Sequence, residues 1–263
     1  MMRNAVLAVL VAAAGATAAN AEVKTKVVTY THDGTTLKGF LAWDDAVKGK
    51  RPGVLVVHEW WGLNDYARNR ATELAKLGYV AFACDMYGEG KTTEHPKEAG
   101  QFATEVRNNL KVWQGRATAG LKVLQDNEMV DGKNLAAIGY CFGGSTALQL
   151  AYTGADVRAV VTFHAALPEP TAEQAKAIKA KILICHGAAD KFVPEKSAQA
   201  LREALESAKV DYEMNYYGGA THSFTVPDIG KAGVPGLAYN AEADRRSWQD
   251  MLRLFHEALG RKK

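Results

Sequence analysis

One cysteine of the sequence lies in a setting that suits a nucleophile. Cys141 is the third residue of Gly-Tyr-Cys-Phe-Gly-Gly at 139–144, between an apolar run and a helical pattern. The segment matches the nucleophile elbow G-x-S-x-G with cysteine in place of serine. Small flanking residues let strand and helix approach around the strained turn that carries the nucleophile. The following helix points its N-terminus at the thiol, which favours the thiolate and makes the backbone N–H of Phe142 an oxyanion donor.

Two other interpretations of residues 139–144 are available. A glycine-rich turn between strand and helix can bind phosphate, but this one lacks the G-x-G-x-x-G order and the P-loop lysine. The turn could also be structural, with a buried cysteine. This segment alone favours a catalytic role over phosphate binding and over a structural turn, and it excludes neither alternative.

Residues further along the chain favour catalysis. Asp190 ends a short loop after the apolar run 182–185, and His222 lies between the run 211–217 and a final helical pattern. Nucleophile, acid and histidine in this order are typical of α/β-hydrolases. His222 would deprotonate Cys141 or hold it as an ion pair, and Asp190 would orient the imidazole. A lone loop aspartate or histidine is usually a surface residue, but their joint placement is hard to attribute to chance.

The elements that must position these residues follow from the hydrophobic pattern. Alternating residues at 25–31 and 36–43, around Asp33-Gly34, predict an antiparallel hairpin. Short apolar runs that alternate with helical patterns predict a mostly parallel sheet with helices on both faces. We expect strands at 53–58, 79–84, 134–139, 157–163, 181–186 and 211–217, a loop and helix over 88–127, and helices at 64–76, 143–152, 195–207 and 241–259.

The N-terminus has the pattern of an export signal. Residues 1–21 hold Arg3, a short apolar stretch and a small-residue end, Ala19-Asn20-Ala21. This predicts a signal peptide cleaved after Ala21, a single domain over 22–263, and a periplasmic or secreted protein. No second hydrophobic span follows, so we expect no membrane partner.

Composition narrows the function classes. The net charge of +3, with 48% hydrophobic residues, indicates an ordinary globular protein and gives no support for nucleic-acid binding. Cys84 and Cys185 lie in apolar runs and are expected in the core. The seven histidines show no metal-binding spacing, so neither metal nor cofactor is expected. His164 and His186, at strand ends, could border a pocket, although packing or loop hydrogen bonds are the more common role.

Several segments together resemble the dienelactone hydrolase family. The resemblance covers residues 27–259 and implies an α/β-hydrolase fold and cofactor-free cleavage of a small ester or lactone. We expect such a protein to be a monomer. The segments are the elbow, His-Glu-Trp-Trp-Gly at 58–62, Asp-Met-Tyr-Gly at 85–88, Asp-Lys-Phe-Val-Pro at 190–194, and Gly-Ala-Thr-His-Ser-Phe at 219–224.

The resemblance also implies roles for residues outside the elbow. Glu59 would lie beside the thiol and move on substrate binding so that the thiolate forms; a nearby carboxylate disfavours the thiolate until it is displaced. The backbone N–H of Trp60 would be the second oxyanion donor. Trp61, Tyr87 and Phe224 are predicted to contact the substrate, although packing is an alternative for both tryptophans.

One position departs from the family pattern. Val226 stands where the family has an arginine that holds the substrate carboxylate, and Arg107 is the nearest candidate for a second family arginine. Without a paired guanidinium clamp, the substrate is expected to be a less charged ester or lactone. Two rival functions remain: a thiol-dependent redox or acyl-transfer protein, for which no C-x-x-C motif exists, and a non-catalytic binding protein on the same scaffold.

Overall fold

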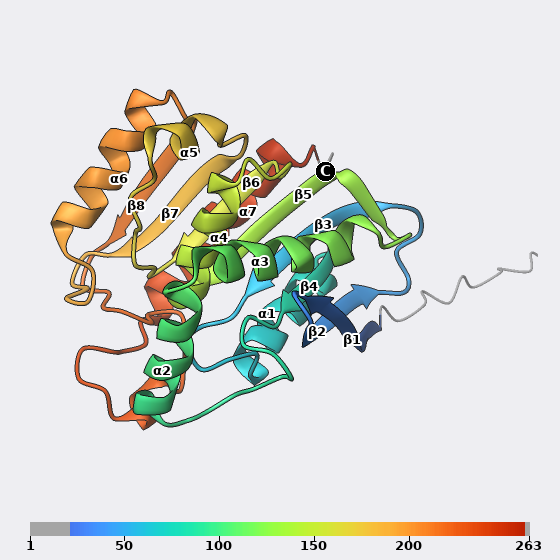
Figure 1. Cartoon of the computed structure of the whole chain (residues 1–263), viewed down its shortest axis with the longest axis horizontal. Helices are drawn as coiled ribbons and strands as arrows, with labels where there is room; N and C mark the ends of the chain where they lie inside the picture. Colours follow the sequence, from blue (N-terminus) through green and yellow to red (C-terminus); the bar gives the residue numbers. More distant parts are fainter. Residues whose placement is uncertain (1–21, 261–263) are drawn as a thin grey trace, which may run out of the picture.

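The computed structural model describes residues 22–260. One eight-stranded sheet runs through this part of the chain in the order β1-β2-β4-β3-β5-β6-β7-β8 (Figure 1). The predicted signal peptide, residues 1–21, lies outside the described residues. Within residues 22–260, no helix is both long and apolar enough to cross a bilayer.

The sheet combines an antiparallel edge with a parallel body. β1 pairs antiparallel with β2 and β2 with β4, while the strands from β4 to β8 run parallel. Asp33 and Gly34 form the hairpin turn with positive φ angles of 45° and 75°, as a tight two-residue hairpin turn requires. The strands are β1 Val23–His32, β2 Thr35–Asp44, β3 Arg51–Val57, β4 Val80–Cys84, β5 Val130–Tyr140, β6 Ala159–Phe163, β7 Lys181–Gly187 and β8 Tyr212–Tyr217.

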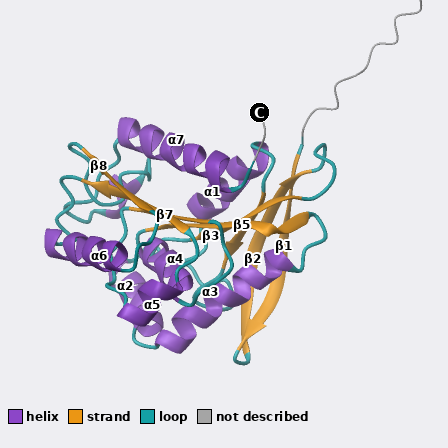
Figure 2. Cartoon of the chain, turned by 90° about the horizontal axis from the view of Figure 1, so that it is seen from above, coloured by secondary structure: helices purple, strands orange, loops and turns teal. Residues whose placement is uncertain are grey.

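Helices cover both faces of the sheet (Figure 2). On one face, α1 Asp65–Lys76 and α7 Ala241–Ala258 pack on the sheet through residues such as Leu74 and Phe255. The other face carries α2 Pro96–Arg107, α3 Leu110–Gln125, α4 Phe142–Tyr152, α5 Ala172–Ala177 and α6 Glu195–Ser207. β4 and β6 are buried along their whole length, which explains their unbroken apolar runs.

The predicted fold is confirmed, with local differences. The stretch 88–127 holds two helices, α2 and α3, because Asn109 caps a second helix through its side chain. Two short elements were not predicted: α5, which begins with a capping box of Thr171 and Gln174, and the 3-10 helix η1, Ile229–Ala232. Both are too short for a helical period to appear in the sequence.

Candidate active site

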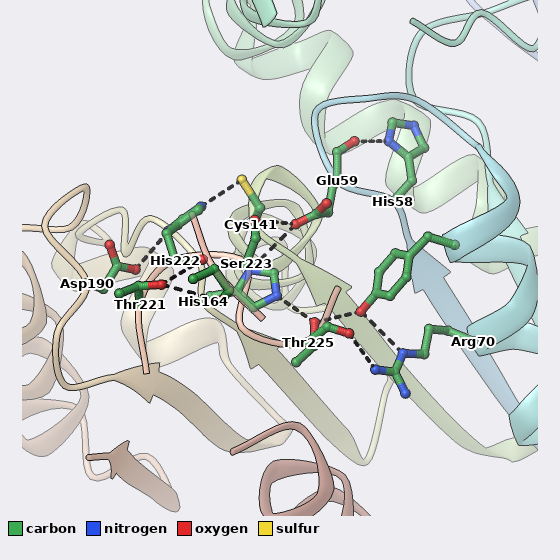
Figure 3. Close-up of polar contacts among 12 residues, drawn as sticks. His58, Glu59, Arg70, Cys141, His164, Asp190, Thr221, His222, Ser223 and Thr225 are labelled. Carbon is green, nitrogen blue, oxygen red and sulfur yellow. Dashed lines mark hydrogen bonds and ion pairs between the residues drawn. The ribbon is translucent and has the colours of Figure 1, made fainter. Parts of the chain in front are cut away.

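Polar side chains gather where the parallel strands end. Glu59 follows β3, Cys141 follows β5, His164 follows β6, Asp190 follows β7 and His222 follows β8. Parallel strands present their carboxyl ends at one edge of the sheet, and ligand sites of open α/β sheets lie outside that edge. Figure 3 shows these side chains converging on one another.

Cys141 occupies a strained turn between β5 and α4. Its φ and ψ are 52° and −112°, a region that costs energy for a residue with a side chain. The turn needs the glycines around it: a Cβ on Gly139 would lie 2.0 Å from the Gly143 carbonyl oxygen, and a Cβ on Gly143 would lie 2.2 Å from that of Val57. Phe142 begins α4, so the helix itself leaves its backbone N–H without a partner.

Cys141, His222 and Asp190 form a continuous hydrogen-bonded series. Sγ of Cys141 lies 3.1 Å from Nε2 of His222, and Nδ1 of His222 lies 2.8 Å from Oδ2 of Asp190. The Asp190 carboxylate also accepts the backbone N–H of Phe192 at 2.8 Å. With Asp190 on Nδ1, that nitrogen carries a proton and Nε2 faces the thiol, the arrangement expected of a general base.

The electrostatics of this series favour a charged imidazole. Burial alone lowers the pKa of His222, but the adjacent Cys141 and Asp190 raise it to about 10. For Asp190, burial raises the pKa and the His222 hydrogen bond and charge lower it, with a net lowering. A protonated His222 beside an ionised Asp190 is therefore favoured.

Glu59, in the loop after β3, is almost completely buried. Only 2% of the residue is exposed, and its Oε1 accepts a hydrogen bond from the Ser223 hydroxyl at 2.8 Å. Burial raises the pKa of its carboxyl, against a lowering by Ser223 and by the charge of His222. The protonated form of Glu59 is therefore favoured more than in a solvated carboxyl.

A chain of buried polar groups continues from Glu59 toward α1 (Figure 3). Nδ1 of His164 is 3.8 Å from Oε1 of Glu59, and Nε2 of His164 is 2.7 Å from the Thr225 hydroxyl. Thr225 Oγ1 is 2.6 Å from the Tyr66 hydroxyl, which accepts Nε–H of Arg70 at 3.2 Å. The sequence singled out only His164 from this chain, and no short motif links Arg70 to Thr225 because 155 residues separate them.

A cavity of about 210 Å³ opens beside Cys141. Its walls are mostly apolar, and among residues 22–260 Arg107 is the only arginine or lysine that lines it. The Arg107 guanidinium lies 5.3 Å from the centre of the Phe142 ring, in cation–π contact. The lining residues are Trp60, Arg107, Cys141, Ala166, Phe192, Val193, His222, Val234 and Leu237.

Trp61, Tyr87 and Phe224, predicted to contact substrate, are not among the described residues that line this cavity. Phe224 is fully buried against Tyr217 in the core between the sheet and α7. Tyr87 is buried, and its hydroxyl donates to the backbone oxygen of Trp60 at 3.0 Å, so it fixes the loop after β3. Trp61 lines another cavity, of about 430 Å³, with Glu59 and Val226.

Cys84 and Cys185 are fully buried in β4 and β7, and burial raises the pKa of both thiols. Across residues 22–260, no group of three or more histidine, cysteine or acidic side chains is placed to hold a metal ion.

Comparison with known proteins tests the family resemblance that the motifs suggested. The model of the dienelactone hydrolase family matches residues 37–259. This chain belongs to the dienelactone hydrolase family. The resemblance noted from the sequence is thereby confirmed.

Relatives of this family member cover most of its length. Protein usf of Aquifex pyrophilus is 30% identical over 76% of this chain and 86% of its own. A candidate carboxymethylenebutenolidase of Synechocystis sp. is 28% identical over 90% of this chain and 98% of its own.

Two solved structures are similar as well, each covering 90% of this chain and 99% of its own with a TM-score of 0.88. One is m3DLH, at 40% identity. The other, at 42% identity, is a dienelactone hydrolase-like promiscuous phosphotriesterase from metagenomic libraries.

Proposed function

We propose that this protein hydrolyses small esters or lactones with Cys141 as nucleophile, His222 as acid and base, and Asp190 as the group that orients His222. The observation that carries the proposal is the unbroken series from Sγ of Cys141 through His222 to Asp190, at a strained elbow beside a cavity. A binding module has no need of this series, and a dithiol redox role lacks a second thiol at the site, since Cys84 and Cys185 lie in strands.

The reaction would proceed through a thioester. Cys141 Sγ attacks the ester carbonyl carbon, and the backbone N–H groups of Phe142 and Trp60 stabilise the resulting oxyanion. The C–O bond then breaks, and the leaving alkoxide takes the proton held by His222. Water, deprotonated by His222, attacks the thioester carbonyl carbon. The C–S bond then breaks, the acid departs, and the Cys141 thiolate and the protonated His222 are restored.

The cavity supports a compact substrate with limited charge. Its apolar walls of Phe192, Val193 and Leu237 suit an alkyl or aryl group. Arg107 can bind one hydrogen-bond acceptor or anionic group of the substrate. Val226 supplies no guanidinium near Glu59. We therefore propose a substrate with at most one negative charge, because a second would lie unpaired against apolar walls.

A second candidate activity is the cleavage of phosphotriesters. The similar structure of the promiscuous phosphotriesterase, at 42% identity and a TM-score of 0.88, supports it. A neutral triester carries no charge that needs a clamp. The thiolate that attacks a carbonyl carbon can attack phosphorus with release of the alkoxide or phenoxide group, and water then cleaves the S–P bond and releases the phosphodiester. Turnover of paraoxon by wild type and not by Cys141→Ala would support this activity.

The first experiment is a burst assay of the mature chain, Glu22–Lys263, with p-nitrophenyl acetate, followed by intact mass. We expect a burst and an acetyl adduct that Cys141→Ala abolishes. Cys185→Ala is the matched control, because this thiol is buried in β7, and it should keep both signals. A burst that persists in Cys141→Ala would refute the proposed nucleophile.

Export and oligomeric state complete the proposal. We propose that residues 1–21 are removed on export to the periplasm or the medium, and that the mature protein is a monomer. N-terminal sequencing of the exported protein and light scattering after gel filtration would check the two statements. An intact Met1 in the exported protein, or a dimer mass, would contradict them.

A further inference from the structure

Among residues 22–260, His164 is a buried group of this site whose hydrogen bonding is incomplete, as are Tyr140 and His186. His164 is fully buried and holds a positive φ of 41° after β6. Its Nδ1 has no hydrogen-bond partner among residues 22–260, although Oε1 of Glu59 lies 3.8 Å away. A buried polar atom without a partner is costly, so its presence beside a carboxylate requires an explanation.

The polar chain behind His164 supports one assignment of the proton on its ring. Arginine only donates, so Arg70 Nε–H must donate to the Tyr66 oxygen. In the order that makes each hydroxyl both an acceptor and a donor within the chain, Tyr66 donates to Thr225 Oγ1 and Thr225 donates to Nε2 of His164. In a neutral imidazole that accepts at Nε2, the proton is on Nδ1, the nitrogen that faces Glu59.

We propose that His164 is a positioning residue for Glu59: its Nδ1–H, supported by the chain from Arg70, is the donor that receives the ionised Glu59 carboxylate, whose Oε1 lies 3.8 Å away. In the present position the carboxylate is bonded to the Ser223 hydroxyl. A shift of Oε1 toward Nδ1 would complete the hydrogen bonding of both groups. Ser223 and His164 would then provide the donors for Glu59 in a chain where Val226 offers none.

The charges around the two groups agree with a neutral donor. Glu59 faces His222 from the loop after β8, Tyr66 from α1 and Tyr87 from the loop after β4. Burial, and then the charge of His222, lower the pKa of His164 well below its usual value; the charges of Arg70 and His186 add to the lowering. His164 is therefore neutral at physiological pH and acts on Glu59 by its N–H dipole alone.

This inference rests on the proposed function, in which Glu59 lies beside a nucleophilic Cys141, but its test does not depend on turnover. The titration of the Glu59 carboxyl would be followed by NMR on the mature chain labelled with ¹³C at the glutamate carboxyl carbon. The signal that disappears in Glu59→Gln identifies Glu59. Loss of a donor to the ionised form raises the pKa, because that form alone uses the hydrogen bond.

Two substitutions of His164 separate its two nitrogens. His164→Gln keeps a polar group near Nε2 for Thr225 and removes the donor at Nδ1, whereas His164→Asn keeps an amide N–H near Nδ1. We expect His164→Gln to raise the pKa of Glu59 by about one unit, a tenfold change in the ionisation constant. We expect His164→Asn to leave it within a few tenths of a unit of wild type.

Tyr66→Phe provides a test that leaves His164 in place. Removing the Tyr66 hydroxyl leaves the Thr225 oxygen free to accept Nε2–H of His164, which allows the other tautomer, so the pKa of Glu59 should rise by less than in His164→Gln. An unchanged pKa in both His164→Gln and Tyr66→Phe would overturn the inference. Equal shifts in His164→Gln and His164→Asn would overturn it too, because ring volume would then be the cause. Failure of the acetyl adduct in wild type would reject the proposed function and leave this titration readable.

Discussion

The polar residues of the site form two halves, a cavity side and an interior side, which differ in solvent access. On the cavity side, Cys141 and His222 line a cavity that a substrate can enter, and Asp190 supports His222. On the interior side, Glu59, His164 and Thr225 are 2% exposed or less. The first half can form and neutralise charge during a reaction, whereas burial in the second raises the pKa of Glu59 and lowers that of His164.

This difference predicts separate contributions of the two halves to activity and to stability. The groups on the cavity side should determine the rate of the reaction and contribute little to folding. The groups on the interior side should contribute strongly to stability, because a buried polar network is costly when one member is removed. Substitutions in the two halves should therefore affect activity and stability separately.

Asp190→Asn should produce the largest change in rate. The amide removes the charge that favours the His222 imidazolium and can present an N–H to Nδ1, which places the wrong tautomer toward Cys141. We expect kcat to fall roughly 10²–10⁴-fold, with a melting temperature close to that of wild type. Stopped-flow acylation with p-nitrophenyl acetate and calorimetry would measure the two effects. A loss in kcat below tenfold would show that Asp190 does not orient His222.

Arg70→Met should produce the largest change in stability. Arg70 is 8% exposed, donates to the Thr225 carbonyl at 2.9 Å and pairs with Asp244 at 2.5 Å. Removing one partner of a buried pair costs about 3–5 kcal/mol. Urea unfolding would measure the loss, with Arg245→Met as control because that side chain is 65% exposed. Equal effects of the two substitutions would contradict the proposed role of the interior half.

Glu59→Gln, in the interior half, should stabilise the protein in a pH-dependent way. Because burial raises the pKa of Glu59 in the fold, the wild type gains relative stability below the unfolded pKa and loses it as pH rises through the folded pKa. Glutamine stays neutral and can still accept from Ser223. The melting temperature of the variant should exceed that of wild type at pH 8, by about 2–4 °C per kcal/mol, and the excess should shrink toward pH 4.

The control for Glu59→Gln is Glu203→Gln, a change at an exposed carboxylate of α6. It should leave the dependence of melting temperature on pH almost unchanged. A variant at Glu59 that is less stable than wild type at pH 8 would show that the ionised carboxylate is well paired in the fold.

Arg107→Met should have the smallest effect, limited to charged substrates. Arg107 is an exposed residue at the end of α2 that lines the cavity, and a solvent-screened contact of this kind is worth ~1 kcal/mol or less. We expect KM to rise up to about fivefold for a p-nitrophenyl ester that carries a carboxylate. A neutral p-nitrophenyl ester of similar size should keep its KM. An equal rise for both esters would indicate that Arg107 only shapes the cavity wall.

The sequence alone determined the fold class and the three residues of the hydrogen-bonded series. The reason is local: the parallel strands appear as apolar runs, the residues after them share one edge of the sheet, and the glycine pattern around Cys141 encodes the elbow. The start of α1 could also be predicted, because Asn64 caps this helix through its own side chain. These features depend on residues only a few positions apart.

Only the tertiary structure decided which side chains reach the cavity and which lie behind it. Phe224 and Tyr87 stand beside motif residues in sequence but pack inward, while Val234 and Leu237 line the cavity from a loop without a motif. The contact of Arg70 with Thr225 joins residues 155 positions apart. Such contacts depend on how α1 and the loop after β8 pack together. No local sequence pattern predicts a contact between residues so far apart in the chain.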